Sequence, residues 1–403
     1  MIPRLKPTLG WSELATILLP ASSDGVERFE TAFAELMGQT HAIAFPYGRT
    51  GLMLLLQAMG WRDREIICPA YTCVVVPHAI VSSGNEPVFI DSCEYDFNMD
   101  LDQAEAAITD RTAAIVATSI FGYPVDLDKL DAIRKKHPHI EIIQDCAHSY
   151  AAEWQGRPVQ REGLAAIFGI NISKIMTSIF GGMVTTDDDA LNERLRALRD
   201  ESLEPATMTK SLRRRLYLAA VYPAFWGPAY GLVNRLERSE FLNRFVKYYD
   251  EAIIDMPLDH LTEMAAIEAA VGCVQVRRYS GIVAHRQATA AYYDDQLQGL
   301  PDFVLPPIVD GATYSHYVPR VSDRDALLAS GLLRGVQFGQ LIEYCVPEMN
   351  AYAERPGARF PCPLASRFAA TTINLPLSIP PVKAARVAEV IKRSRCERAD
   401  YGK

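Results

Sequence analysis

The sequence predicts an α/β protein: a large domain with a mostly parallel, seven-stranded sheet flanked by helices, then a smaller C-terminal α+β domain. Three observations predict this class. Short, almost continuously apolar segments alternate with helical patterns through the first half of the chain, as in buried parallel strands joined by helices. The 403 residues suffice for two domains with a sizeable core. The composition, 49% hydrophobic and 22% charged, is that of a globular protein rather than a disordered one.

Seven apolar segments predict the strands of the large domain. Each is followed by a turn or by a helical pattern, as expected when helices connect parallel strands. A helix with apolar residues at helical spacing precedes the first strand, and a charged amphipathic helix over 187–200 follows the last. The predicted strands span residues 41–46, 66–69, 87–91, 113–119, 140–145, 165–170 and 183–186.

Residues 203–255 break this alternation. A basic cluster at 210–215 leads into an apolar run that is interrupted by Pro223, Gly227 and Pro228, which predicts an apolar helical insertion at about 205–250. We place residues 1–255 in the large domain and residues 256–403 in the small one. The elements predicted after the insertion are a long helix over 262–297, a strand over 314–321, and helices over 323–330 and 381–394.

Charge and cysteine usage narrow the possible functions. A formal net charge of −8 disfavours nucleic acid as the main partner. The eight cysteines are scattered and form no CxxC pair, so we expect neither a disulfide framework nor a metal site. Because the chain also lacks the pattern of a signal peptide, we predict a cytoplasmic protein with reduced thiols.

Two charged residues point to pyridoxal 5'-phosphate chemistry. Asp145 ends an apolar strand, and a lone lysine, Lys174, follows it by 29 residues (174 − 145) between apolar segments. A carboxylate facing the pyridine nitrogen keeps the ring protonated, and a desolvated lysine amine forms the Schiff base with the cofactor aldehyde and then carries the proton. Taken alone, each residue has another interpretation: Asp145 as a helix cap or turn residue, and Lys174 as a lysine whose aliphatic stem covers the core. The presence of both favours the catalytic interpretation.

Other residues are candidates for binding the cofactor. Gly48, Arg49 and Thr50 lie between a strand and the start of an apolar helix, a junction where free amides and the helix dipole favour phosphate, with a turn that only caps the helix as the alternative. His148, three residues after Asp145, is a candidate for a polar or stacking contact with the ring, with an ordinary surface or capping histidine as the alternative. Tyr71 is a candidate for flanking the ring, with core packing as the alternative.

Taken in order, these motifs resemble the DegT/DnrJ/EryC1/StrS family of pyridoxal phosphate-dependent sugar aminotransferases. The resemblance covers most of the chain. It includes YGRTGLMLLLQAMG as the phosphate loop with its helix, the FGYPVD turn, IIQDCAHSYAAEW as the acid strand, the segment around Lys174 with Gly181 and Gly182, and the long helix that begins near residue 262.

The resemblance implies a fold-type I enzyme that is a homodimer with shared active sites. It implies transfer of an amino group, usually from L-glutamate, to a keto or aldehydo sugar that is often nucleotide-linked, for surface glycan or secondary-metabolite synthesis. Asp145 matches the family's pyridine partner, Lys174 its Schiff-base lysine, and His148 a position that holds Gln or His.

Several positions depart from the family pattern. Gly169 stands where the family has a serine that donates to the phosphate, so Asn171 or Ser173 is the candidate replacement. Cys73 occupies the position of the aromatic residue that stacks on the ring. Leu258 falls near the asparagine that reaches the partner's phosphate.

The apolar insertion has two interpretations. It is either a helical hairpin that packs on its own domain or a dimer partner, or an element that lies on a membrane surface through residues 210–235. In the second case the basic residues would meet anionic headgroups and the aromatic residues would lie at the boundary. The protein would then be peripheral to the inner face of the membrane, because the segment is too short and too broken to span a bilayer.

Two other functions compete with amino transfer. One is a pyridoxal phosphate-dependent sugar dehydratase or lyase, although family members of that kind replace the lysine with histidine. The other is a non-catalytic regulatory protein that keeps the fold. The retained pair of Asp145 and Lys174 argues against it.

Overall fold

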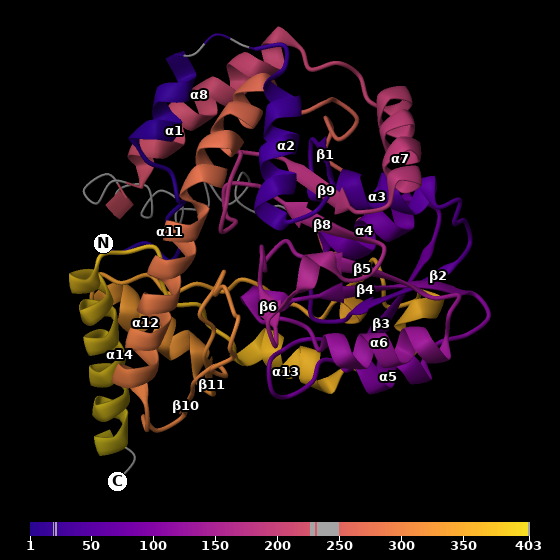
Figure 1. Ribbon diagram of the computed structural model, residues 1–403. Helices are drawn as coiled ribbons and strands as arrows, with labels where there is room; N and C mark the ends of the chain where they lie inside the picture. Colours follow the sequence, from indigo (N-terminus) through magenta and orange to yellow (C-terminus); the bar gives the residue numbers. More distant parts are fainter. Residues whose placement is uncertain (19, 21, 226–229, 232–249, 402–403) are drawn as a thin grey trace.

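The computed structural model describes residues 1–401 except 19, 21, 226–229 and 232–249 (Figure 1). A central sheet lies between helices, and a second group of helices and short strands adjoins it. The strands of the sheet are β1 (His41–Phe45), β2 (Glu65–Pro69), β3 (Glu86–Ile90), β4 (Thr112–Thr118), β5 (Glu141–Asp145), β8 (Ala165–Gly169) and β9 (Gly182–Thr186). All seven predicted strands are present to within one residue at each end.

The sheet has the order β1-β9-β8-β5-β4-β2-β3. The five strands from β8 to β3 are mutually parallel, and β9 runs antiparallel to both β8 and β1. The carboxyl ends of β1, β2, β4, β5 and β8 therefore meet at one edge of the sheet, where β9 begins. This confirms the predicted mostly parallel seven-stranded sheet, and such an edge is where ligands of α/β proteins bind.

Helices cover both faces of the sheet because the strands are apolar on both sides. Ile66 and Ile143 pack on one face with α3, α4 and α7, while the adjacent Ile67 and Ile142 pack on the other with α2, α5 and α6. The helices are α2 (Gly25–Met37), α3 (Gly48–Ala58), α4 (Val75–Ser82), α5 (Leu101–Ala106), α6 (Leu127–Lys136) and α7 (Asp189–Ser202).

The C-terminal region contains more helix than strand. It is built from α11 (Ala266–Leu297), β10 (Phe303–Val304), β11 (Arg320–Val321), α12 (Arg324–Leu333), α13 (Pro363–Thr371) and α14 (Pro381–Tyr401). One hydrophobic cluster includes residues from Ile2 to Ile391, so both regions share it, and the division at residue 255 stays a prediction.

The strand predicted over residues 314–321 is mostly wrong. Only Arg320 and Val321 form a strand, paired with β10. The preceding backbone binds a turn of the large region instead: Thr313 donates its N–H to the Gly122 carbonyl at 3.0 Å, and His316 donates to that of Phe121 at 3.3 Å. Pro319 has no N–H for a sheet ladder.

The predicted insertion begins with a helix, α8 (Met208–Ala224), which lies beside the short helix α1 (Trp11–Ala15) (Figure 1). Trp226 and most of residues 232–250 lie outside the described part of the chain. Among the described residues, no helix combines the length and apolar character needed to cross a membrane.

Candidate active site

The predicted chemical residues converge at the carboxyl edge of the sheet. Asp145 is the last residue of β5, and Lys174 follows the end of the neighbouring parallel strand β8. The helix α3 begins at Gly48, just beyond the end of β1 at the same edge, and β9 begins there at Gly182. Two residues 29 positions apart (174 − 145) therefore lie on adjacent strand ends, which the sequence spacing alone did not show.

Asp145 is buried, and its hydrogen-bond donors among the described residues are uncharged. One carboxylate oxygen accepts the backbone N–H of Ala147 at 3.0 Å, and the other accepts the hydroxyl of Thr118 at 3.2 Å. Thr118 can reach it because the two residues are in register on β4 and β5. Burial raises the pKa of the Asp145 carboxyl, and the Ala147 N–H, the Lys174 charge and the Thr118 hydroxyl offset this only in part.

Lys174 lies in a loop whose base is closed by its own backbone. Ile170 donates its N–H to Gly181 at 2.8 Å and accepts that of Ser178 at 2.9 Å. No hydrogen bond joins the Lys174 amine to another residue in the described part of the chain. Burial lowers the pKa of this amine, and the nearby charges of Cys73 and Asp145 raise it only in part.

Asn171 and Ser173 shape the loop next to Lys174. The Asn171 side-chain oxygen accepts the backbone N–H of Ser173 at 3.0 Å and its hydroxyl at 2.6 Å, and the Asn171 carbonyl accepts the Lys174 N–H at 3.0 Å. Both side chains are thus used to form the turn. A side chain at Gly169 would place its Cβ 3.5 Å from the Lys174 Cε, an ordinary contact distance, so this position lies directly beside the lysine side chain.

His148 and His316 form an aromatic cluster with Phe121 beside these groups. Nδ1 of His148 accepts the Phe121 N–H at 3.2 Å, and the two rings stack with centroids 6.0 Å apart. His316 lies 5.4 Å from His148, centroid to centroid. Burial, followed by the Lys174 charge, lowers the pKa of His148 well below its usual range, so we expect it to be neutral with its proton on Nε2. We call Asp145, His148, Lys174 and His316 the ring-end cluster.

His316 and its support, Arg286, were not found from the sequence. Nε2 of His316 is buried and has no partner among the described residues. Arg286, on α11, donates to the carbonyl of Ser315 at 2.6 Å and so holds the segment that carries His316. A signal existed for Arg286, because it lies at helical spacing between the buried Ile282 and Tyr293. No local pattern marks His316.

The predicted phosphate turn is formed by close backbone packing. A Cβ added to Gly48 would lie 2.9 Å from the Phe168 carbonyl oxygen, and one added to Gly182 would lie 2.2 Å from the Gly48 nitrogen. Only glycine allows the start of α3 to approach the ends of β8 and β9 this closely. The first amides of α3 therefore lie next to the loop that carries Lys174, as a phosphate site requires.

The side chains of this turn are directed elsewhere. The Thr50 hydroxyl donates to the His260 carbonyl at 3.1 Å, and the Arg49 guanidinium approaches the Asp255 carbonyl at 3.5 Å. Both thus hold the segment that precedes α11. If phosphate binds here, backbone N–H groups rather than these side chains are the main donors.

Tyr71 and Cys73 have different surroundings. Tyr71 is fully buried, its hydroxyl is within 2.9 Å of the Thr372 hydroxyl, and its ring packs on Phe121 and Phe368. Core packing, the alternative weighed above, accounts for these contacts. Cys73 is partly buried and close enough to Lys174 for an electrostatic interaction.

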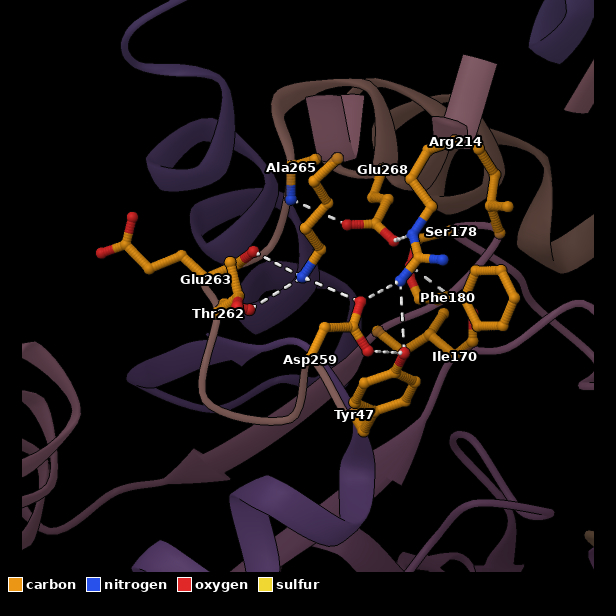
Figure 2. A network of polar contacts seen from close by, with 12 residues as sticks. Tyr47, Ile170, Ser178, Phe180, Arg214, Asp259, Thr262, Glu263, Ala265 and Glu268 are labelled. Atoms are coloured by element: carbon orange, nitrogen blue, oxygen red, sulfur yellow. Dashed lines mark hydrogen bonds and ion pairs between the residues drawn. The ribbon is translucent and has the colours of Figure 1, made fainter. Parts of the chain in front are cut away.

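A second cluster of charges lies beside the phosphate turn (Figure 2). Its residues come from the turn, from α8, from the segment leading into α11 and from the first turn of α11. We call it the α8 cluster; it consists of Tyr47, Lys210, Arg214, Asp259 and Glu268.

The α8 cluster bears on the membrane hypothesis. Two of the four basic residues expected to meet headgroups, Lys210 and Arg214, are engaged inside the protein. A third, Arg215, donates to the Ile17 carbonyl. Arg213 is exposed. Membrane contact stays a prediction that now depends on Arg213 and on the apolar residues of α8.

A groove of about 660 Å³ lies away from this edge, along α2 and the edge strand β1. Arg196 and Arg199 line it, and both pair with the buried Glu30, at 2.8 and 2.9 Å. Glu30 also accepts the Ala44 N–H at 2.7 Å. These contacts fasten α7 and α2 to the sheet edge, a structural role.

Comparisons with known proteins agree with the fold and with the resemblance seen in the sequence. The model of the DegT/DnrJ/EryC1/StrS aminotransferase family matches residues 20–395. GDP-perosamine synthase of Caulobacter vibrioides is 30% identical over 285 residues, which are 70% of this chain and 65% of that protein, slightly less than two thirds of its length.

Two solved structures share the fold. DesV of S. venezuelae, determined in complex with a ketimine intermediate, superposes with a TM-score of 0.75 at 24% identity, covering 94% of this chain and 92% of that one. PseC of Helicobacter pylori, an aminotransferase involved in the biosynthesis of pseudoaminic acid, superposes with a TM-score of 0.77 at 20% identity, covering 98% and 99%.

Proposed function

This chain belongs to the DegT/DnrJ/EryC1/StrS aminotransferase family, and from this membership and the ring-end cluster we propose that it is a pyridoxal phosphate-dependent aminotransferase. The proposed reaction moves an amino group from an amino acid, L-glutamate in our proposal, to a keto or aldehydo sugar. The predicted fold class and the family resemblance are both confirmed.

One observation carries the proposal: a buried carboxylate, Asp145, and a half-buried amine, Lys174, lie at the same edge of the sheet without an ion pair between them. The pKa of Asp145 is raised and that of Lys174 is lowered, both mainly by burial. Such uncompensated charges are costly unless a ligand completes them. Strongly shifted groups at the carboxyl edge of an α/β sheet are typical of a catalytic site.

The residues present fit pyridoxal phosphate. Asp145 offers a buried anion for a protonated pyridine nitrogen, and the amine of Lys174 is available for attachment to the aldehyde. The glycine-packed start of α3 offers amides to the phosphate. His148, with its proton on Nε2, offers a hydrogen-bond donor near Lys174.

Each residue has a definite task in this proposal. When bound, pyridoxal phosphate supplies an electron-withdrawing ring that stabilises negative charge on the substrate carbon. Asp145 keeps the ring nitrogen protonated. Lys174 removes a proton and returns it, and its lowered pKa increases the fraction of neutral amine available for this at neutral pH. Thr118 and Ala147 hold the carboxylate in position.

The proposed substrates and assembly rest on the family and on the relatives. GDP-perosamine synthase is named for the sugar nucleotide GDP-perosamine, and PseC is an aminotransferase involved in the biosynthesis of pseudoaminic acid. We therefore propose a sugar acceptor, with a nucleotide-linked sugar as the first class to try. We also propose a homodimer with shared active sites, which analytical ultracentrifugation would test.

Absorbance spectroscopy tests the proposed function. The purified protein with pyridoxal phosphate should show a visible absorption band that L-glutamate bleaches, and Lys174→Ala should lack the band. A band that survives every amino-acid donor would argue against transfer. No band in the wild-type protein would refute cofactor binding.

A further inference from the structure

Helix α8 reaches the proposed phosphate end of the site from outside the sheet. The segment 255–265 lies between α8 and the phosphate turn, and side chains of both form hydrogen bonds with it. From the turn, Thr50 and Tyr47 donate to His260 and Asp259, at 3.1 and 2.6 Å. From α8, the Lys210 amine donates to the carbonyls of Thr262 and Glu263, at 2.8 and 2.9 Å.

Arg214 joins these parts directly. Its Nε donates to Glu268 at 2.8 Å, and one Nη donates to both Asp259 at 2.7 Å and the Tyr47 hydroxyl at 3.2 Å. Its guanidinium lies over the Phe180 ring, 4.1 Å from the centroid (Figure 2). Phe180 immediately precedes Gly181 and Gly182. One side chain of α8 therefore contacts residues from both backbone segments that form the phosphate turn.

The charges of this cluster balance internally. Two cations, Lys210 and Arg214, face two carboxylates, Asp259 and Glu268. Glu268 is also fixed by the Ala265 N–H at 2.7 Å. Because its charges balance, the cluster is not expected to bind a further anion. The guanidinium of Arg214 has a rigid, planar arrangement of N–H donors, and it therefore fixes the positions of the groups it binds.

Tyr47 transmits this position to the turn. It directly precedes Gly48, which packs so closely against β8 and β9 that an added methyl group would lie 2.9 Å from the Phe168 carbonyl oxygen. A change in the Tyr47 backbone would disturb this close contact and reorient the first amides of α3. Because amide hydrogen bonds weaken steeply with misalignment, small movements would reduce phosphate affinity.

We propose that Arg214 is a positioning residue for the cofactor phosphate: from α8 it fixes Tyr47 and the Phe180–Gly182 segment so that the amides at the start of α3 bind phosphate. The inference rests on the proposed function, because it takes that helix start as the phosphate site. It also gives a task to the beginning of the segment that the sequence marks as an insertion.

The test compares two arginines that each pair with a buried glutamate. Arg214→Met removes the fork beside the turn. Arg196→Met, on α7, is the matched control: it removes a contact with Glu30 of α2, whose carboxylate likewise accepts a backbone N–H. Equilibrium dialysis of the purified proteins against graded pyridoxal phosphate gives the dissociation constant, and urea unfolding gives stability.

We expect Arg214→Met to raise the dissociation constant about tenfold, the size of a lost charged hydrogen bond, while Arg196→Met leaves it unchanged. Arg214→Lys should restore part of the affinity. Tyr47→Phe, which keeps the ring and loses only the hydroxyl, should raise the constant about threefold and serves if Arg214→Met does not fold.

Unchanged affinity in both Arg214→Met and Tyr47→Phe would overturn the inference, and so would equal losses in Arg214→Met and Arg196→Met. If wild-type protein binds no pyridoxal phosphate, the proposed function fails, and the inference with it. If the wild type binds pyridoxal phosphate tightly and the variants at position 214 bind it equally well, the inference is refuted while the proposed function stands.

Discussion

The ring-end cluster and the α8 cluster bury similar groups and treat them differently. In the α8 cluster each charged side chain has an opposite charge within 3.7 Å. These partners outweigh burial for Arg214 and Asp259, so the pKa of Arg214 is raised and that of Asp259 is lowered, while burial still lowers the pKa of Lys210 and raises that of Glu268. In the ring-end cluster burial raises the pKa of Asp145 and lowers that of Lys174, and no ion pair joins either residue to another described residue. The α8 cluster thus pairs its charges internally, whereas the ring-end cluster leaves its charges for a ligand.

This difference separates structure from function. Partnered buried charges hold elements in place, and removing one partner leaves the other exposed to the full cost of burial. Unpartnered charges already bear that cost, so a catalytic site is expected to lower the stability of the protein that carries it. The contrast makes opposite predictions for acids in the two clusters.

The largest expected effect is on catalysis. Asp145→Asn removes the anion that keeps the ring nitrogen protonated, and the rate of amino transfer should fall by roughly 10²–10⁴-fold, the range for general acid–base groups. The cofactor should still bind through Lys174 and the phosphate turn. Single-turnover absorbance with L-glutamate measures this, and an unimpaired rate would contradict the role given to Asp145.

The second effect concerns stability and has opposite signs in the two clusters. Glu268→Ala leaves Arg214 without its buried partner and should lower the free energy of unfolding by about 3 kcal/mol. Glu30→Ala removes the carboxylate that pairs with Arg196 and Arg199, and it should lower the free energy of unfolding for the same reason. In cofactor-free protein, Asp145→Asn should raise the same free energy by about 1 kcal/mol. Urea unfolding of the three variants measures these changes in the free energy of unfolding. If all three variants were less stable than the wild type, the proposed difference between paired and unpaired buried charges would be wrong.

The third effect is a pH dependence that belongs to Glu268. Burial raises its pKa from 4.5 to about 7, and Arg214, the Ala265 N–H and Lys210 offset this only in part. The pKa of Glu268 is higher in the folded state than in the unfolded state. Its protonated carboxyl therefore makes its full contribution to the free energy of unfolding below pH 4.5, and this contribution is lost as the pH rises through about 7.

Glu268→Gln should remove this dependence, so the wild type should lose about 3 kcal/mol relative to the variant between pH 4.5 and 8. Arg214 and Lys210 on α8, and Asp259 beyond them, are the charged groups that face this carboxyl. Parallel curves for wild type and variant in that interval would show that Glu268 does not titrate there.

The smallest effect tests the membrane hypothesis. With Lys210 and Arg214 engaged internally, Arg213 is the exposed residue of this group, and Arg213→Gln should weaken binding to vesicles containing anionic lipid by about 1 kcal/mol. Its cofactor affinity and stability should equal those of the wild type. Equal sedimentation of both proteins with such vesicles, and none with either, would each refute an electrostatic contact through Arg213.

Local patterns were enough to predict most of the fold and to select the candidate pair, Asp145 and Lys174. The strands are uninterrupted apolar segments, so their position follows from burial on both faces. Asp145 and Lys174 stand out because each is a charge next to apolar neighbours. Gly48 stands out as a glycine at the start of a helix, and the structure adds that it packs closely against Gly182.

Contacts across long sequence distances could not be predicted in this way. His316 enters the site because its backbone binds the turn at Phe121, nearly 200 residues earlier, and this replaced the predicted strand. Arg214 looked like one of several surface basic residues until the fold brought Asp259 and Glu268 beside it. Thr50 and Arg49 were placed correctly at the turn, but the direction of their side chains depends on the segment before α11.

Chemical trapping tests the central claim most directly. The purified protein is incubated with pyridoxal phosphate, reduced with borohydride, digested and examined by mass spectrometry. The account predicts a pyridoxyl group on Lys174 and on no other lysine, and protein carrying Asp145→Asn should be labelled at the same place. Label spread over surface lysines, or a Lys174 peptide without label, would contradict it.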